Sequence, residues 1–190
     1  MVLSDKLFPH DISAEESVIG SLLLDGMSFT KIASFLEPGH FYLSPNKIIF
    51  EIARDLFNRQ EPINQITIAH ELETQEKLEE VGGRAYLAKV VDVVPTSIHI
   101  KHYANLVRRT ATMRTLINAA ENISDIGFDN DPDVETSLAK AEDIIYGIRS
   151  DQPSRDFVPL RETLTPFLET SSTDINDGEN APIGSGFKML

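Results

Sequence analysis

The sequence has no cysteine and no tryptophan among its 190 residues. Without cysteine it has no disulfide framework, no thiolate nucleophile and no cysteine-based zinc site, and a reducing compartment fits it best. Neither the first ten residues nor any later stretch resembles a secretory signal or approaches the roughly 18 apolar residues of a membrane span. We therefore expect a protein of the cytoplasm, neither secreted nor embedded in a membrane.

Basic residues are few, with 17 Lys and Arg against 30 Asp and Glu, so the formal net charge is −13. This charge repels a phosphate backbone, and nucleic acid is not the expected ligand of the chain as a whole. Hydrophobic residues make up 41% of the sequence, which indicates a globular rather than a disordered protein. A chain of this length is expected to form one domain with a tail.

The apolar residues recur at helical spacing and no useful run alternates as a strand would, so the pattern predicts an all-α fold. The segment 13–16, Ser-Ala-Glu-Glu, matches a capping box and predicts a helix that ends near Asp25. Ser44 and Pro45 predict the start of a second helix, and shorter helices are expected over residues 67–75 and 85–93. Residues 1–96 are therefore expected to form a helical globule.

A long helix is expected from Ser97 to about Gly127, on the order of 45 Å in length. After a turn at residues 129–132, apolar residues step by four, three, four and three positions, which is the spacing of a coiled-coil seam. Residues 97–149 are therefore expected to form an antiparallel helical hairpin that projects from the globule. The residues expected in its seam are Leu116, Ile117, Val134, Leu138 and Ile145.

Residues 150–190 are rich in Ser, Thr, Asp, Asn, Gly and Pro, which is typical of a linker. Leu160, Leu164 and Phe167 interrupt this composition at helical spacing and predict one short amphipathic helix, which Pro166 splits or kinks. Such a stripe has no partner within the linker, so these three apolar residues are expected to dock elsewhere.

No residue pattern predicts a catalytic, cofactor-binding or metal-binding site. His99 and His102 share a helix face, but without a third ligand at a telling spacing they are more typical of capping or packing. His70 opens a segment that lacks the second histidine of a metalloprotease helix, because Thr74 stands in its place. Residues 184–188 do not form a phosphate-binding loop, since no strand precedes them and Met189 replaces the required Ser or Thr.

Lys101, Arg108, Arg109 and Arg114 form a basic cluster in this acidic sequence. Arginine and tyrosine are favoured anchors at protein interfaces, so the cluster indicates a partner or subunit face. Two alternatives stay open: a solvated face that pairs with the acidic residues at 121, 135 and 142, and a surface that binds single-stranded DNA with salt-sensitive affinity. The residues expected on the partner face are Tyr86, Tyr103, Arg108 and Arg109.

Several short segments, taken in order, carry a family resemblance. They include PHDISAEESVIG at 9–20, GGRAYL at 82–87, PTS at 95–97, YANLVRR at 103–109 and RTLI at 114–117. Together they resemble the amino-terminal domain of DnaB-type replicative DNA helicases over about residues 9–150. The sequence departs from that family at Asn46, where histidine is usual, at Asn64, where aspartate is usual, and at Ser185, where threonine is usual.

The resemblance implies a collar domain whose copies pair within a hexameric ring and receive the carboxy-terminal domain of primase or a helicase loader. It also implies that the helix over 159–169 docks on a neighbouring motor domain. Residues 183–190 resemble the segment with which the motor domain of that family begins. ATP, Mg²⁺ and DNA would be bound by that motor, beyond Leu190, so this chain is expected to hold no cofactor and to act by association. The alternative is a stand-alone adaptor or regulator of a helicase, without a motor of its own.

Overall fold

The computed structural model describes residues 7–129 and 132–150, and every regular element in these ranges is a helix. The predicted all-α class is thereby confirmed. All of the described residues belong to one compact unit. The linker expected over 150–190, with Leu160, Leu164 and Phe167, lies outside the described residues except for Ser150. Within the described ranges, no helix combines the length and the apolar character that crossing a membrane requires.

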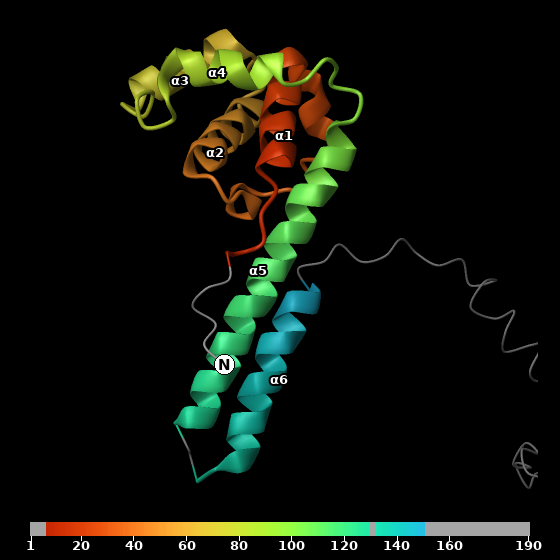
Figure 1. The fold of residues 1–190 in the computed structure, drawn as a ribbon, viewed down its shortest axis with the longest axis vertical. Helices are drawn as coiled ribbons and strands as arrows, with labels where there is room; N and C mark the ends of the chain where they lie inside the picture. Colours follow the sequence, from red (N-terminus) through yellow and green to blue (C-terminus); the bar gives the residue numbers. More distant parts are fainter. Residues whose placement is uncertain (1–6, 130–131, 151–190) are drawn as a thin grey trace, which may run out of the picture. The chain divides into compact units, whose positions relative to one another are not determined.

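Helix α1 (Ile12–Leu24) lies at the centre of the globule (Figure 1). It contacts α2 (Ser44–Asn58), α4 (Gly83–Asp92) and the long helix α5 (Ile100–Phe128). Because it has neighbours on several sides, most of its residues are buried. The helices of the globule are α1 (Ile12–Leu24), the 3₁₀ helices η2 (Gly26–Lys31) and η3 (Pro38–His40), α2 (Ser44–Asn58), α3 (Gln65–Thr74) and α4 (Gly83–Asp92).

The start of α1 differs from the prediction. Asp11 is the N-cap residue, and its Oδ1 accepts a hydrogen bond from the Ala14 amide at 3.0 Å. Ser13 lies inside the first turn, where its carbonyl oxygen accepts from the Ser17 hydroxyl. The capping box predicted at 13–16 is therefore wrong, because an equally good capping residue stands two positions earlier in the sequence.

Four phenylalanines anchor the irregular stretches of the globule to its helices. The ring of Phe29 in η2 lies 5.5 Å from that of Phe50 and 4.7 Å from that of Phe57, both in α2, measured between centroids. Phe41, in the connection before α2, lies 4.9 Å from Phe50. Since Phe29 and Phe50 are fully buried, these ring contacts hold the region between α1 and α2 in one arrangement.

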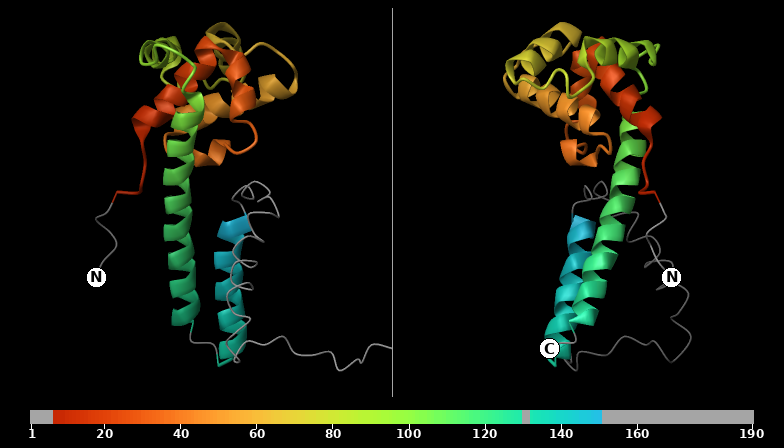
Figure 2. Two further views of the ribbon diagram at one scale, coloured as in Figure 1. Left: turned by 90° about the vertical axis from the view of Figure 1, so that its right-hand side faces the viewer. Right: turned by 60° about the vertical axis from the view of Figure 1, so that its left-hand side comes forward.

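A helical hairpin is formed by α5 (Ile100–Phe128) and α6 (Val134–Ser150) (Figures 1 and 2). The first half of α5 buries Ile100, Ala104 and Val107 in the globule, whereas its second half runs antiparallel to α6. Asp133 caps α6 by accepting hydrogen bonds from the Thr136 hydroxyl at 2.6 Å and amide at 3.1 Å. The hydrogen bond from the Thr136 hydroxyl, and after it the one from the Thr136 amide, lowers the pKa of the Asp133 carboxyl.

Candidate interaction surfaces

A fully buried carboxylate, that of Glu15, joins α1 to the start of α2. Its Oε1 accepts from the Tyr42 amide at 2.7 Å, and its Oε2 accepts from the Leu43 amide at 3.2 Å and from Asn46 Nδ2 at 3.1 Å. Leu43, the N-cap residue of α2, offers no side-chain cap of its own. Glu15 therefore caps α2 from another helix, and the positive end of the helix dipole favours its negative charge.

Asn46 extends this network to α4. Its Oδ1 accepts a hydrogen bond from the Tyr86 hydroxyl at 2.7 Å, so the two polar ends of one buried amide join α1 to α4. Burial of the phenol, followed by the charge of nearby Glu16, raises the pKa of Tyr86 to about 12. Tyr86, expected on a partner face, thus turns its hydroxyl inward and is half-buried. The local sequence pattern carries no signal of this long-range contact.

The remaining residues of the expected partner face lie on α5 with different exposure. Tyr103 packs against the core and is half-buried. The guanidinium of Arg108 is partly buried and lies 5.1 Å from the ring centroid of Phe35, a cation–π contact. Arg109 is exposed, and of these residues it presents the most accessible charge to a partner.

Arg114 is used inside the fold. Its Nη1 donates to the Pro9 carbonyl at 2.8 Å and its Nη2 donates to the His40 carbonyl at 2.7 Å. The same guanidinium lies 5.7 Å from the ring of Tyr42, which stacks on His10 at 4.5 Å. Arg114 therefore fastens the segment before α1 and the helix η3 to α5, and its donors are committed to these carbonyls rather than to a ligand.

Both alternative roles of the basic cluster are weakened by these positions. Binding of single-stranded DNA through Arg108, Arg109 and Arg114 is disfavoured because the guanidinium of Arg114 is held by backbone carbonyls. Within the described ranges, no ion pair joins the cluster to Glu121, Glu135 or Glu142, and the ion pairs found lie on the globule. The same ranges hold no group of three or more acidic or histidine side chains suited to a metal ion.

The hairpin encloses a small apolar groove of about 260 Å³ between α5 and α6. Leu116 and Ile145, both expected in the seam, line this groove together with Ala119. Ile117 is partly buried. The structure differs from the expectation at Val134 and Leu138, which are 65% and 61% exposed and so do not lie between the helices. The less exposed residues of α6 are Ser137, Ala141, Ile144 and Ile148.

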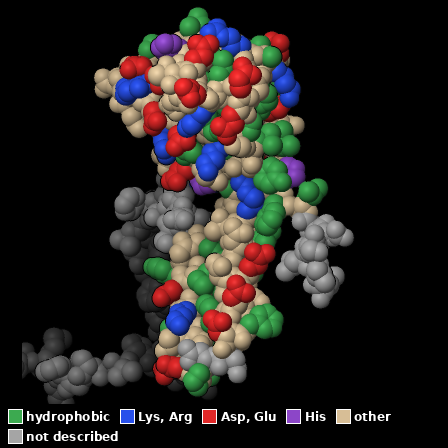
Figure 3. Space-filling view, turned by 90° about the vertical axis from the view of Figure 1, so that its left-hand side faces the viewer, with side chains coloured by type: hydrophobic (Ala, Val, Ile, Leu, Met, Phe, Trp, Pro, Cys, Tyr) green, Lys and Arg blue, Asp and Glu red, His purple; other side chains and the backbone are tan. Residues whose placement is uncertain are grey.

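Three apolar side chains of α6 form an outer stripe beside the groove, defined by Val134, Leu138 and Ile145. Ile145 lines the groove but is 53% exposed, so the whole stripe is accessible to a partner. Figure 3 shows exposed hydrophobic side chains along the hairpin as well as charged ones. Apolar side chains that line up in this way on a surface are typical of a protein–protein interface.

Comparison with known proteins gives a consistent assignment. The family model described as "DnaB-like helicase N terminal domain" matches residues 7–109. The chain is 30% identical over 190 residues to the replicative DNA helicase DnaB of Geobacillus stearothermophilus, and 32% identical over 190 residues to the replicative DNA helicase DnaC of Bacillus subtilis. Each alignment covers 100% of this chain but 42% of the relative, so the chain spans less than half the length of these helicases.

Solved structures show the same fold. The N-terminal domain of DnaB helicase from Mycobacterium tuberculosis superposes with a TM-score of 0.70 at 30% identity, and the match covers 75% of this chain and 99% of that one. A DnaB-like replicative helicase, studied with its interactions with primase, superposes with a TM-score of 0.64 at 21% identity, over 84% of this chain and 35% of that one.

Proposed function

We propose a function from the premise that this chain belongs to the DnaB-like helicase N-terminal domain family. In this proposal the chain serves a replicative DNA helicase by assembling its subunits and by recruiting primase or a helicase loader. The observation that carries the proposal is the outer stripe of the hairpin, an apolar surface with no covering element among the described residues. The chain acts by binding, and ATP, Mg²⁺ and DNA are handled by the motor domain of the family. Its proposed location is the cytoplasm.

The proposed subunit contact is made by the outer stripe. Val134, Leu138 and Ile145 are exposed and lie at a spacing that presents them on one face of α6. Covering them with the same surface of a second copy would create a two-fold contact, which is the commonest form of subunit pairing. We further propose that Leu160, Leu164 and Phe167 of the linker dock on a neighbouring motor domain.

The proposed primase or loader contact uses the exposed side of α5, with Arg109 on it and with Arg108 and Tyr103 at its two borders. Arg109 is exposed, and Arg108 and Tyr103 are partly so, which is the arrangement of a charged rim beside a half-buried aromatic anchor. Support comes from the DnaB-like helicase of the same fold, which is described with its interactions with primase.

The subunit contact is tested by sedimentation of the full chain and of Leu138→Asp over a range of concentrations. Since Leu138 is 61% exposed, the substitution should leave helicity unchanged while it weakens self-association at least about tenfold. The matched control is Ile66→Asp, which places the same charge at a position on α3 that is 81% exposed. A wild-type chain that stays monomeric throughout, or a control that dissociates equally, would contradict the proposal.

The recruiting face is tested by titrating the full chain with the carboxy-terminal domain of the primase from the same organism. Arg109→Glu should weaken binding about fivefold or more, whereas the control Lys47→Glu, at an exposed position on α2, should not. Equal effects of the two charge reversals would mean that only overall charge matters. Titration with a single-stranded oligonucleotide completes the test, because a loss restricted to DNA binding would favour the nucleic-acid alternative.

A further inference from the structure

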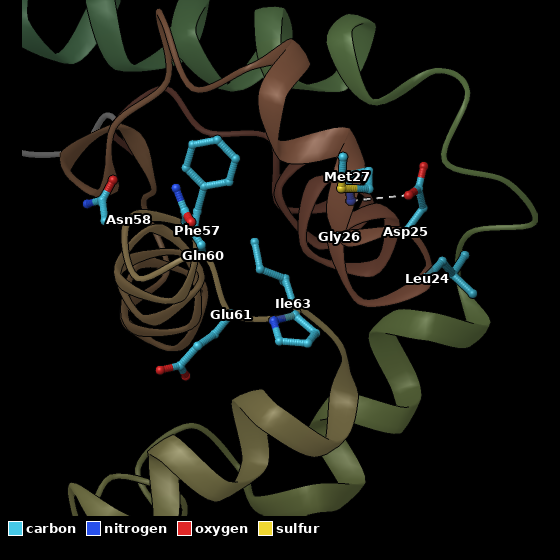
Figure 4. A pocket seen from close by; sticks show the side chains of 10 residues that line it. Leu24, Asp25, Gly26, Met27, Phe57, Asn58, Gln60, Glu61 and Ile63 are labelled. Carbon is cyan, nitrogen blue, oxygen red and sulfur yellow. Dashed lines mark hydrogen bonds between the residues drawn. The ribbon is translucent and has the colours of Figure 1, made fainter.

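An open groove lies on the globule between the end of α1 and the end of α2. Residues 24–27 form one wall and residues 57, 58 and 60–63 form the other, and the groove has a volume of about 870 Å³ (Figure 4). It uses none of the residues of the outer stripe or of the α5 face described above. Binding in this groove is therefore a contact separate from the two already proposed.

The walls of the groove are held in place by close backbone packing and by hydrogen bonds. A Cβ atom on Gly26 would lie 2.4 Å from the Ile63 carbonyl oxygen, so the two walls are packed together at the base and only glycine fits there. On one wall, Asp25 accepts hydrogen bonds from the Ser28 hydroxyl at 2.6 Å and the Ser97 hydroxyl at 3.1 Å. On the other, the turn after α2 is closed by the Glu61 amide, which donates to the Leu56 carbonyl at 2.9 Å. The groove is therefore preformed.

The surface of the groove exposes large apolar side chains to water, which is unfavourable for a free monomer. Met27 is 76% exposed, Leu24 is 47% exposed and Phe57 is 36% exposed, and Ile63 is buried beneath them. In Figure 4 the side chains of Met27, Phe57 and Ile63 lie around the opening between the two walls. A surface of this kind suits aliphatic side chains inserted from a partner.

The charge at the edges is negative. Asp25 and Glu61 line the groove, and no lining residue carries a positive charge. The neighbouring Arg59 lies within 2.6 Å of Glu71 and 3.4 Å of Glu61, so two carboxylates already share it. The hydrogen bond from Ser28 lowers the pKa of Asp25, which keeps that edge ionised at neutral pH. The groove therefore favours an occupant with basic side chains beside its apolar ones.

We propose that this groove docks an amphipathic helical segment of a partner protein, with aliphatic side chains on one face and lysine or arginine at its edges. The occupant differs from a second copy of this chain, whose proposed contact is the outer stripe and shares no residue with the groove. A small apolar molecule would gain nothing from the negative charge of the two edges. The open shape and the apolar floor between two acidic edges match a helix laid into a groove.

The test uses a synthetic amphipathic peptide of about 14 residues, with leucines on one face and lysines at the edges, and the matched peptide with glutamates in place of lysines. The full chain, labelled at its methionine methyl groups, is titrated with each peptide in an NMR experiment. The lysine peptide should bind at least about tenfold tighter and shift the Met27 signal. Met113, 44% exposed on the hairpin, serves as an internal control and should not shift.

Two substitutions locate the effect. Met27→Asn and Glu61→Lys should each weaken the lysine peptide about fivefold, and Glu61→Lys should strengthen the glutamate peptide. The controls Met113→Asn and Glu79→Lys make the same changes at exposed positions outside the groove and should change neither affinity. A shift of Met113 in place of Met27, equal affinity for the two peptides, or equal losses in variants and controls would overturn the proposal.

Discussion

Replacing Glu15 by alanine removes the acceptor for three donors at the junction of α1 and α2. The Tyr42 amide, the Leu43 amide and Asn46 Nδ2 all donate to this carboxylate in the native structure. The bond to Asn46 is buried and the two amides are partly buried, so water replaces the lost acceptor incompletely. The substitution also leaves a cavity, because the Glu15 side chain is fully buried.

The magnitude follows from the donors. A buried donor left unsatisfied costs about 1–3 kcal/mol, and removing one partner from a buried charged network costs about 3–5 kcal/mol. With one donor fully buried and two partly so, we expect Glu15→Ala to lower the free energy of unfolding by about 3–5 kcal/mol. This is a large share of the roughly 5–15 kcal/mol that stabilises a typical domain.

Glu15→Gln should cost less, about 1–2 kcal/mol, because the network can rearrange. An amide NH₂ in place of Oε2 meets both Asn46 Nδ2 and the Leu43 amide. Rotation of the Asn46 amide by half a turn presents its oxygen to this NH₂, whereas the Leu43 amide loses its acceptor, which accounts for the remaining cost. The Asn46 NH₂ then faces the Tyr86 hydroxyl, which can accept a hydrogen bond as well as donate one. In the double variant with Tyr86→Phe this acceptor is lost, so the two substitutions together should destabilise by more than their sum.

Urea denaturation of the full chain, followed by circular dichroism, measures these differences. The control is Glu79→Ala, which removes an exposed carboxylate and should change the free energy of unfolding by no more than about 0.5 kcal/mol. A loss below about 1 kcal/mol for Glu15→Ala would refute the assignment of Glu15 as the cap of α2. Strictly additive effects of Glu15→Gln and Tyr86→Phe would refute the rearrangement of Asn46.

Three further predictions concern other contacts. The pKa of Tyr86 is raised from 10.0 to about 12, so its protonated hydroxyl stabilises the fold fully below pH 10 and this stabilisation is lost as the pH rises through 12. In urea titrations the free energy of unfolding should therefore fall more steeply at alkaline pH for the wild type than for Tyr86→Phe. Asp11→Ala should lower the free energy of unfolding by about 1 kcal/mol and Ser13→Ala by much less, and the reverse order would restore the capping box. A Cβ on Gly20 would lie 2.1 Å from the Val90 carbonyl oxygen, so Gly20→Ala should lower the free energy of unfolding by at least about 2 kcal/mol. An unchanged melting curve would contradict the close packing of α1 on α4.

The helices of the globule were predictable because their apolar residues recur at helical spacing, whereas the network around Glu15 was not recognised. A signal for it does exist in the sequence. Ile19 and Leu23 form one apolar row of α1, and continuing that row four positions toward the amino terminus reaches Glu15. A carboxylate in line with a buried row indicates a buried acceptor, but its donors come from residues 27 to 31 positions away, which no local pattern identifies.

The interface residues could be predicted only in part, because exposure on a helix depends on what packs against it. Tyr86 and Arg109 both belong to polar or aromatic types that are common at interfaces. The structure turns the Tyr86 hydroxyl into the network at Asn46 and leaves Arg109 exposed. Residue type therefore identified the region, whereas the tertiary contacts decide which side chain remains available to a partner.

The hairpin shows why two apolar stripes on one helix are ambiguous. Val134, Leu138 and Ile145 have seam spacing, yet they are more exposed than a second row of α6 at similar spacing, Ser137, Ala141, Ile144 and Ile148. The spacing alone does not decide which row faces α5, and packing on that helix leaves the row of Val134, Leu138 and Ile145 largely exposed. For a monomer that exposure is unfavourable, but for a domain that pairs with a second copy it provides the contact surface. It follows that Leu138→Asp separates the two interpretations, because a buried seam residue would unfold the hairpin, whereas an interface residue would only prevent self-association.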